Sequence, residues 1–343
     1  MLLTRLSKLC TLDGVSGCEG AVREYILSEV RPYADEVRVD SMGNVMALRR
    51  GRKMGGKCLM LAAHMDEVGF IVKRITDEGM LKFGVVGGMD PRILMGKRVR
   101  VGEEKIPGII GIKAVHLTTA EERRKVPTVS DMYIDIGATS RADAEKDVAP
   151  GDYIAFDSDF YSMGDRGFVK GKAIDDRAGC AVLLELIRQT PACDTWFVFT
   201  VQEEVGLRGA QIAAHALRPD IALVLEGTTA ADLPNVDAHK RVCSAGAGVV
   251  IGIMDRGTIY DAELTRMLRE ICEEKQIKWQ YKQYTSGGTD AGKIHLTGAG
   301  VRTCVLAAAV RYLHSPVCVA SLHDIEAMEE TAREFINRMG EME

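Results

Sequence analysis

The chain has 343 residues, of which 46% are hydrophobic and 27% charged, and its formal net charge is −5. This composition is typical of a folded globular protein and excludes a disordered or fibrous one. Because the net charge is negative, we expect neither nucleic acid nor another polyanion as a partner. Hydrophobic runs are shorter than the roughly 20 residues of a membrane span, and the first residues lack a signal-peptide core. We therefore expect a cytoplasmic protein that has no membrane partner.

The first part of the chain predicts helices followed by a buried strand. Ser16 stands three residues before Glu19, ahead of hydrophobic residues at helical spacing, and this pair predicts a capping box at the start of a helix. The hydrophobic run of residues 57–63 predicts a buried strand. The carboxyl end of that strand delivers His64 and Asp66.

The remainder of the chain shows two different sequence patterns. Over residues 67–165 short alternations of hydrophobic and polar residues follow one another between glycines and prolines, which predicts a small all-β domain. From 166 onward strands alternate with helices, ending in an amphipathic helix over 322–339. Such alternation implies a mostly parallel sheet sandwiched by helices. The predicted fold is α/β, with a main domain of 1–66 and 166–343 and an inserted all-β domain of 67–165.

Carboxylates and imidazoles occur where the predicted strands end. In an open α/β sheet, ligands bind outside the carboxyl ends of the strands, and carboxylates gathered there repel one another unless cations neutralise them. Imidazoles and carboxylates without a thiolate suit a pair of divalent ions about 3.5–4 Å apart, bridged by one carboxylate. The groups in question are His64, Asp66, Glu203, Glu204, Glu226 and His314 after predicted strands, and Asp175 just before a predicted helix.

Several motifs resemble the tetrahedral aminopeptidases, a family that includes glutamyl and deblocking aminopeptidases and members sometimes labelled endoglucanase or cellulase. The resemblance covers nearly the whole chain in the same order. The motifs are Ala-His64-Met-Asp66, Lys172-Ala-Ile-Asp175-Asp176-Arg177, Gln202-Glu203-Glu204-Val-Gly, Ser286-Gly-Gly-Thr-Asp290 and Arg311-Tyr-Leu-His314-Ser-Pro.

The resemblance implies two divalent metal ions per subunit, with zinc favoured and cobalt or manganese as alternatives. Glu203 would be the general base that takes a proton from the attacking water and later passes it to the leaving amine. Asp66 would hydrogen-bond the far nitrogen of a ligating histidine. Many relatives carry aspartate where this chain has Glu226, so the longer side chain could alter metal choice or spacing. The implied metal ligands are His64, Asp175, Glu204, Glu226 and His314, with Asp175 bridging the two ions.

The resemblance further implies an aminopeptidase that removes the N-terminal residue of short peptides, with a PDZ-like inserted domain that mediates dimer contacts. Dimers of relatives assemble into a tetrahedral dodecamer, which we expect here as well. Residues 286–290 would shape the substrate pocket. Three alternatives stay open: an N-acyl amino acid deacylase or other amidohydrolase with the same centre, a metal-free glycoside hydrolase, and a peptide-binding protein without catalysis. The chain contains no G-x-S-x-G motif and no phosphate-binding glycine loop, which argues against serine-hydrolase and nucleotide chemistry.

Overall fold

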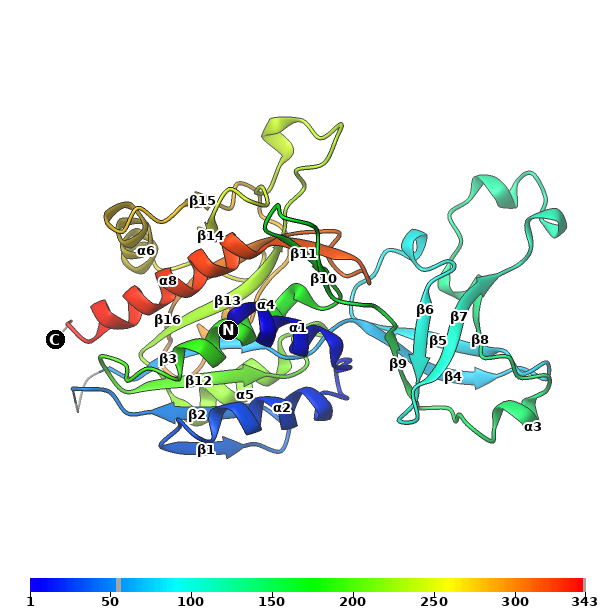
Figure 1. Ribbon diagram of the computed structural model, residues 1–343, viewed down its shortest axis with the longest axis horizontal. Coiled ribbons are helices and arrows are strands. Elements are labelled where there is room, and N and C mark those ends of the chain that lie inside the picture. Colours follow the sequence, from blue (N-terminus) through cyan, green and yellow to red (C-terminus); the bar gives the residue numbers. More distant parts are fainter. Residues whose placement is uncertain (54–56, 342–343) are drawn as a thin grey trace.

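The computed structural model describes residues 1–53 and 57–341, which form an α/β unit with a β-barrel beside it (Figure 1). The barrel strands all fall within residues 69–156, and the chain before and after them builds the α/β unit. The predicted α/β fold with an inserted all-β domain is therefore confirmed.

Within the described residues, eleven strands form the sheet of the α/β unit. In spatial order they are β1 (Glu36–Val39), β2 (Val45–Arg49), β12 (Thr195–Thr200), β3 (Leu59–His64), β13 (Ile221–Thr229), β16 (Arg302–Arg311), β17 (Cys318–Ser321), β11 (Phe168–Gly171) and β10 (Tyr161–Ser162), with β14 (Val249–Ile251) on β16 and β15 (Trp279–Tyr281) on β14. The central strands β12, β3, β13 and β16 are parallel, and antiparallel strands extend the sheet on both sides. The sheet is thus mixed, with its parallel part in the middle.

Helices cover both faces of this sheet. One face packs against α1 (Leu2–Thr11), α2 (Gly20–Val30), α4 (Ile174–Leu186), α6 (Ala262–Glu274) and α8 (Leu322–Met339), and the other against α5 (Arg208–Leu217) and α7 (Ala291–Ile294). Because both faces are covered, β3 and β12 are buried along their whole length, which explains their continuous hydrophobic sequences. In the part of the chain that is described, none of the helices combines the length and hydrophobicity needed to cross a membrane.

Residues 69–156, all of them described, form a closed antiparallel barrel. Its strands in spatial order are β4 (Gly69–Ile75), β5 (Leu81–Val86), β8 (Met132–Asp135), β7 (Ile106–Ile112), β6 (Arg98–Val101) and β9 (Tyr153–Phe156). Phe70 packs edge-on against Phe83 and Phe156, with ring centroids 5.1 and 5.2 Å away, and these rings form the centre of the barrel core. Shorter elements are α3 (Arg141–Ala144) and 3-10 turns at Pro91–Ile93, Val115–Leu117, Glu122–Arg124, Val129–Asp131 and Ala238–Lys240.

The predicted capping box ahead of α2 is wrong. Ser16 does not cap the helix, because its hydroxyl donates to Asp66 Oδ2 at 2.6 Å. Glu19 directs Oε1 to the backbone N–H of Gln202 at 3.3 Å. Both side chains are therefore bonded to segments that follow the central strands β3 and β12, which a local sequence pattern does not reveal.

Candidate metal centre

The carboxyl ends of the central strands bring the five predicted ligands together. His64 is the last residue of β3, and Glu226 lies within β13. Glu204 follows β12 and His314 follows β16, each in a loop. Asp175 lies in the first turn of α4, where its backbone is not helical, with φ −83° and ψ 112°. One edge of the sheet thus gathers side chains from five separate segments.

His64, Asp175 and Glu226 form the inner group. His64 Nε2 lies 3.2 Å from Asp175 Oδ1 and 3.3 Å from Glu226 Oε1. The three side chains are only 2%, 8% and 7% exposed. The side chains of this group are therefore almost entirely buried.

Asp175, Glu204 and His314 form the outer group. His314 Nε2 lies 3.2 Å from Glu204 Oε2 and 3.7 Å from Asp175 Oδ2. Asp175 therefore directs one carboxylate oxygen to each group, Oδ1 to the inner and Oδ2 to the outer. His314 is 32% exposed, so the outer group opens toward solvent.

Burial and mutual repulsion shift the pKa values of these side chains. Burial raises the pKa of Glu204 to about 7, and Asp175 adds to the rise. Burial, with Asp175 again adding, raises the pKa of Glu226 well above its usual value. Burial also opposes charge on Asp175, but hydrogen bonds to His314 and His64 outweigh it and hold the pKa of Asp175 well below its usual range. Three carboxylates facing two imidazoles need positive charge, as protons or as metal ions.

The donor set fits divalent metal ions. In each group, one ligand atom from every residue lies within 4.8 Å of the others. Oε2 of Glu226 is buried, and within the described residues it accepts no hydrogen bond. Imidazole nitrogens and carboxylate oxygens together bind zinc, cobalt and manganese. The thiol of Cys180 donates to the backbone oxygen of His64 at 3.2 Å, so it is engaged elsewhere.

Glu203 lies beside the two groups on the wall of a cavity of about 620 Å³. Asp175, Glu204, Glu226 and His314 line the same cavity. Burial raises the pKa of Glu203 well above its usual value, since His64 only partly opposes the effect. A carboxylate with a raised pKa next to a metal site is suited to accept and return a proton.

Comparisons with known proteins decide the family. The family model described as M42 glutamyl aminopeptidase matches residues 43–330 of this chain. The chain belongs to the M42 aminopeptidase family. The resemblance to tetrahedral aminopeptidases is thereby confirmed, and the protein is a metallo-aminopeptidase that removes N-terminal residues.

Relatives of this M42 aminopeptidase match it along almost its full length. A putative aminopeptidase of Acetivibrio thermocellus is 41% identical over 322 residues, which cover 93% of this chain and 94% of that protein. The structure of a TET aminopeptidase from Thaumarchaeota archaeon SCGC AB-539-E09 has a TM-score of 0.95 at 38% identity, covering 99% and 98% of the two chains. For the Pyrococcus horikoshii TET1 peptidase the TM-score is 0.86 at 33% identity, covering 98% and 99%. That peptidase has been solved as a dodecamer and can assemble into a tetrahedron or a large octahedral shell.

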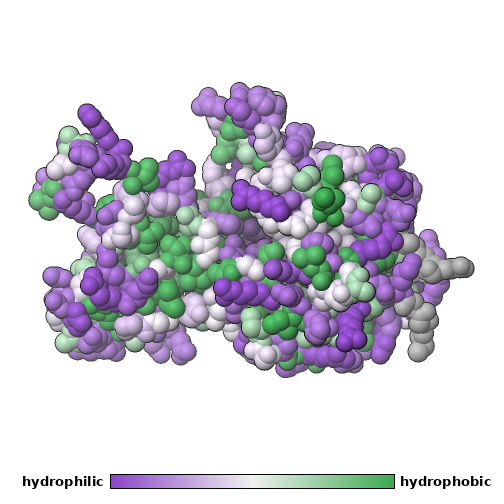
Figure 2. Space-filling model, turned by 180° about the vertical axis from the view of Figure 1, so that it is seen from behind, coloured by the Kyte–Doolittle hydropathy of each residue, from purple (hydrophilic) through white to green (hydrophobic). Residues whose placement is uncertain are grey.

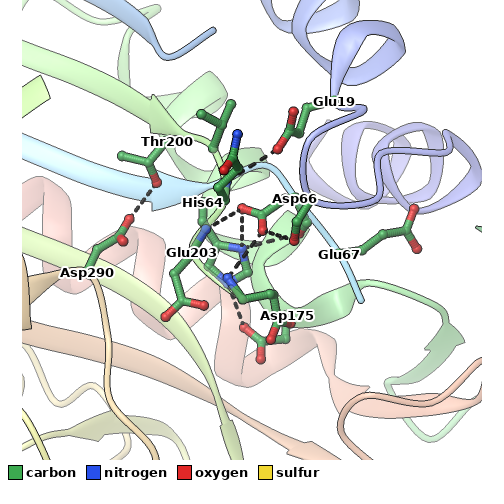
Figure 3. A network of polar contacts seen from close by, with 12 residues as sticks. Glu19, His64, Asp66, Glu67, Asp175, Thr200, Glu203 and Asp290 are labelled. Carbon is green, nitrogen blue, oxygen red and sulfur yellow. Dashed lines mark hydrogen bonds and ion pairs between the residues drawn. The ribbon is translucent and has the colours of Figure 1, made fainter. Parts of the chain in front are cut away.

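Asp66 connects the inner group of the aminopeptidase to the loop after β12 (Figure 3). This side chain is fully buried, and its Oδ1 lies 3.5 Å from His64 Nδ1. Its oxygens accept hydrogen bonds from the backbone N–H groups of Glu203 and Glu204 at 3.0 and 3.2 Å. Because one carboxylate contacts both segments, it fixes His64 relative to the two glutamates.

The predicted pocket loop lies at the cavity, except for its last residue. Residues 286–289 line the cavity. Asp290 is buried beneath them and accepts a hydrogen bond from the hydroxyl of Thr200 at 2.5 Å, and burial raises the pKa of Asp290 to about 6. Asp290 also stands among the charges that raise the pKa of Glu203.

Sequence reasoning missed the residues that support the ligands from other segments. Ser16 bonds Asp66, and the backbone of Gly88, between barrel strands β5 and β6, helps to raise the pKa of His314 by accepting a hydrogen bond from its ring. Lys172 lies three residues before Asp175 and Glu67 three residues after His64, and the two form a buried ion pair with Nζ to Oε1 at 2.7 Å. Of these residues, only Lys172 and Glu67 could have been recognised from the sequence, because each is a charged residue within a motif that is otherwise predicted to be buried.

Proposed function

We propose that this aminopeptidase cleaves the N-terminal residue from short peptides with two divalent metal ions. The observation that carries the proposal is the divided carboxylate of Asp175, whose Oδ1 faces the inner group and whose Oδ2 faces the outer group. A single carboxylate shared in this way is the usual means of holding two ions side by side.

His64 and Glu226 would hold one ion, Glu204 and His314 would hold the other, and Asp175 would contact both. Zinc is the favoured metal, with cobalt or manganese as alternatives, because all three accept nitrogen and oxygen ligands. When bound, the ions supply Lewis-acid charge that polarises the scissile carbonyl and the attacking water.

Glu203 would accept the proton of the attacking water and pass it to the amine that leaves. Its raised pKa supports this role, because a carboxylate whose pKa is raised by burial is a stronger base and can both take and return a proton. Asp66 would keep His64 in one orientation, since it lies at Nδ1 while Nε2 faces the metal site.

We further propose that the chain forms dimers through the barrel and that the dimers assemble into a tetrahedral dodecamer. Figure 2 shows hydrophobic side chains exposed on the barrel half of the molecule, and Ile109, Val115 and Leu117 are 45%, 69% and 62% exposed. The assemblies of the Pyrococcus horikoshii relative support the same geometry.

All nine cysteines are free, which is typical of the reducing cytoplasm.

Two matched variants test the catalytic assignment. Glu203→Gln should keep both metal ions but lower kcat by about a hundredfold to ten-thousandfold, since it removes the base. Glu204→Gln should lose one ion as well as activity. Metal content by mass spectrometry and hydrolysis of free and N-acetylated peptides give the readout. Near-normal turnover by Glu203→Gln would contradict the assigned base, and faster cleavage of N-acetylated peptides would favour the deacylase.

A further inference from the structure

The segment of residues 13–16, between α1 and α2, runs beside the point where the chain leaves β3 for the barrel. The backbone N–H of Glu67 donates to the carbonyl of Gly14 at 2.9 Å, and the N–H of Ser16 donates to the carbonyl of Glu67 at 3.1 Å. The side chain of Ser16 bonds Asp66. This short N-terminal segment therefore lies directly against the support of the metal centre.

Within this segment, the carboxylate of Asp13 contacts three cationic side chains. Its Oδ1 accepts from Lys172 Nζ at 2.8 Å and from Arg100 Nη2 at 2.7 Å, and its Oδ2 lies 3.4 Å from Lys105 Nζ. Arg100 lies on β6 and Lys105 in the following turn, so both belong to the barrel. Burial opposes ionisation of Asp13, but Lys172, Arg100 and Lys105 together hold its pKa below the usual value.

Lys172 links Asp13 to the surroundings of the predicted metal ligands. It is 1% exposed, and its Nζ also donates to Glu67 Oε1 at 2.7 Å. In the sequence it lies three residues before Asp175. Lys172 and Glu67 line a small cavity together with three ligands of the outer group, namely Asp175, Glu204 and His314.

The two buried cations of this network, Lys172 and Arg177, are matched in number by two carboxylates, Asp13 and Glu67. Lys172 and the fully buried Arg177 face Glu67, with Arg177 Nη2 3.6 Å from the same Oε1. Without the charge of Asp13, Glu67 alone would compensate two buried cations. The surplus positive charge would stand close to a site that must attract divalent cations, and in a buried environment such repulsion is weakly screened.

We propose that Asp13 is a positioning residue of the metal centre, which holds Lys172 against Glu67 behind the outer group and ties both to the barrel through Arg100 and Lys105. This inference rests on the proposed metal centre. The N-terminal segment and the barrel then both influence metal affinity, although neither supplies a metal-binding side chain.

The test compares Asp13→Asn with Asp261→Asn in the full-length enzyme. Asp261 is a matched control, because its side chain is 22% exposed against 20% for Asp13 and it pairs with Arg302 at 2.7 Å. It caps α6, and asparagine preserves such a cap. Metal-free protein is titrated with cobalt(II) and followed by visible absorption, and kcat and KM are then measured on the loaded enzyme.

For Asp13→Asn we expect about a tenfold weaker cobalt affinity, which is the lower end of the loss seen when a residue that supports metal ligands is removed. We also expect a changed absorption band and a fall in kcat with little change in KM. Asp13→Glu should recover most of the affinity, and Asp261→Asn should match the unaltered enzyme. Equal cobalt affinity in Asp13→Asn and the unaltered enzyme, or equal losses in both asparagine variants, would overturn the proposal.

A second variant keeps the test decisive if Asp13→Asn does not fold. Arg100→Gln leaves the Lys172–Asp13 pair in place and removes one barrel contact, so it should weaken cobalt binding by a smaller factor. An unchanged affinity in Arg100→Gln would overturn the link to the barrel. Because the titration reads metal binding without peptide hydrolysis, an unaltered enzyme that binds cobalt but cleaves no peptide would contradict the proposed function alone.

Discussion

The inner and outer groups of the candidate metal centre share Asp175 but are built in different ways. The predicted inner ligands His64 and Glu226 lie on regular strands deep in the sheet, and their side chains are 2% and 7% exposed. The predicted outer ligands Glu204 and His314 lie in loops, and His314 has a positive φ of 57° and is 32% exposed. The comparison indicates that strands of the sheet position the inner side chains, whereas loops position the outer ones, of which His314 reaches solvent and Glu204, 6% exposed, does not.

The largest expected effect comes from Asp175, because both groups depend on it. In Asp175→Asn a neutral amide replaces the shared carboxylate and offers only one oxygen ligand. We expect loss of at least one ion and a fall in kcat of about a thousandfold or more, which corresponds to several kcal/mol of lost Lewis-acid stabilisation. Metal analysis and peptide hydrolysis check this. Retention of two ions by the variant would show that the groups do not share a bridging carboxylate.

A second prediction separates the groups by stability of the metal-free protein. His64→Ala removes a fully buried partner of three carboxylates and should lower the free energy of unfolding by about 3 kcal/mol. His314→Ala removes a partly exposed one and should cost about 1 kcal/mol or less. Urea unfolding in the presence of a chelator measures both. Equal losses would mean that the two groups do not differ in how rigidly they are held.

The smallest predicted effect concerns pH. In the metal-free protein the pKa of Glu204 is raised to about 7. Burial alone would lower the pKa of His314, but Asp175 and Glu204 raise it to about 9. Both groups hold protons below these values, and a metal ion must displace them, so the affinity of the outer group should rise as pH increases from 7 toward 9. Cobalt titrations across this range measure the slope. An affinity that is flat over this range would contradict the assignment of Glu204 and His314 as ligands.

The sequence predicts this molecule best where one local pattern determines the structure. The closing helix α8 was predicted over 322–339 and has those bounds, because its hydrophobic residues recur at helical spacing to the end. The strand before His64 was recognisable because a strand buried on both faces is hydrophobic at every position. The ends of such strands then lead directly to the predicted ligands.

Local patterns fail where the decisive contact is made between distant segments. Ser16 satisfies the spacing of a helix cap but bonds Asp66, which lies 50 residues further along the chain. Asp13 and Lys172 are 159 residues apart, and no periodicity relates them. The outer strands β2 and β17 have the same hydrophobic character as the central ones, so the pattern could not show that their pairing is antiparallel.

Anomalous X-ray diffraction at the metal absorption edge, from crystals of the metal-loaded enzyme, would locate the bound ions directly. Two peaks are predicted, one against His64 and Glu226 and one against Glu204 and His314, with the carboxylate of Asp175 between them. A single peak, or peaks remote from these five side chains, would contradict a two-metal centre divided into an inner and an outer half.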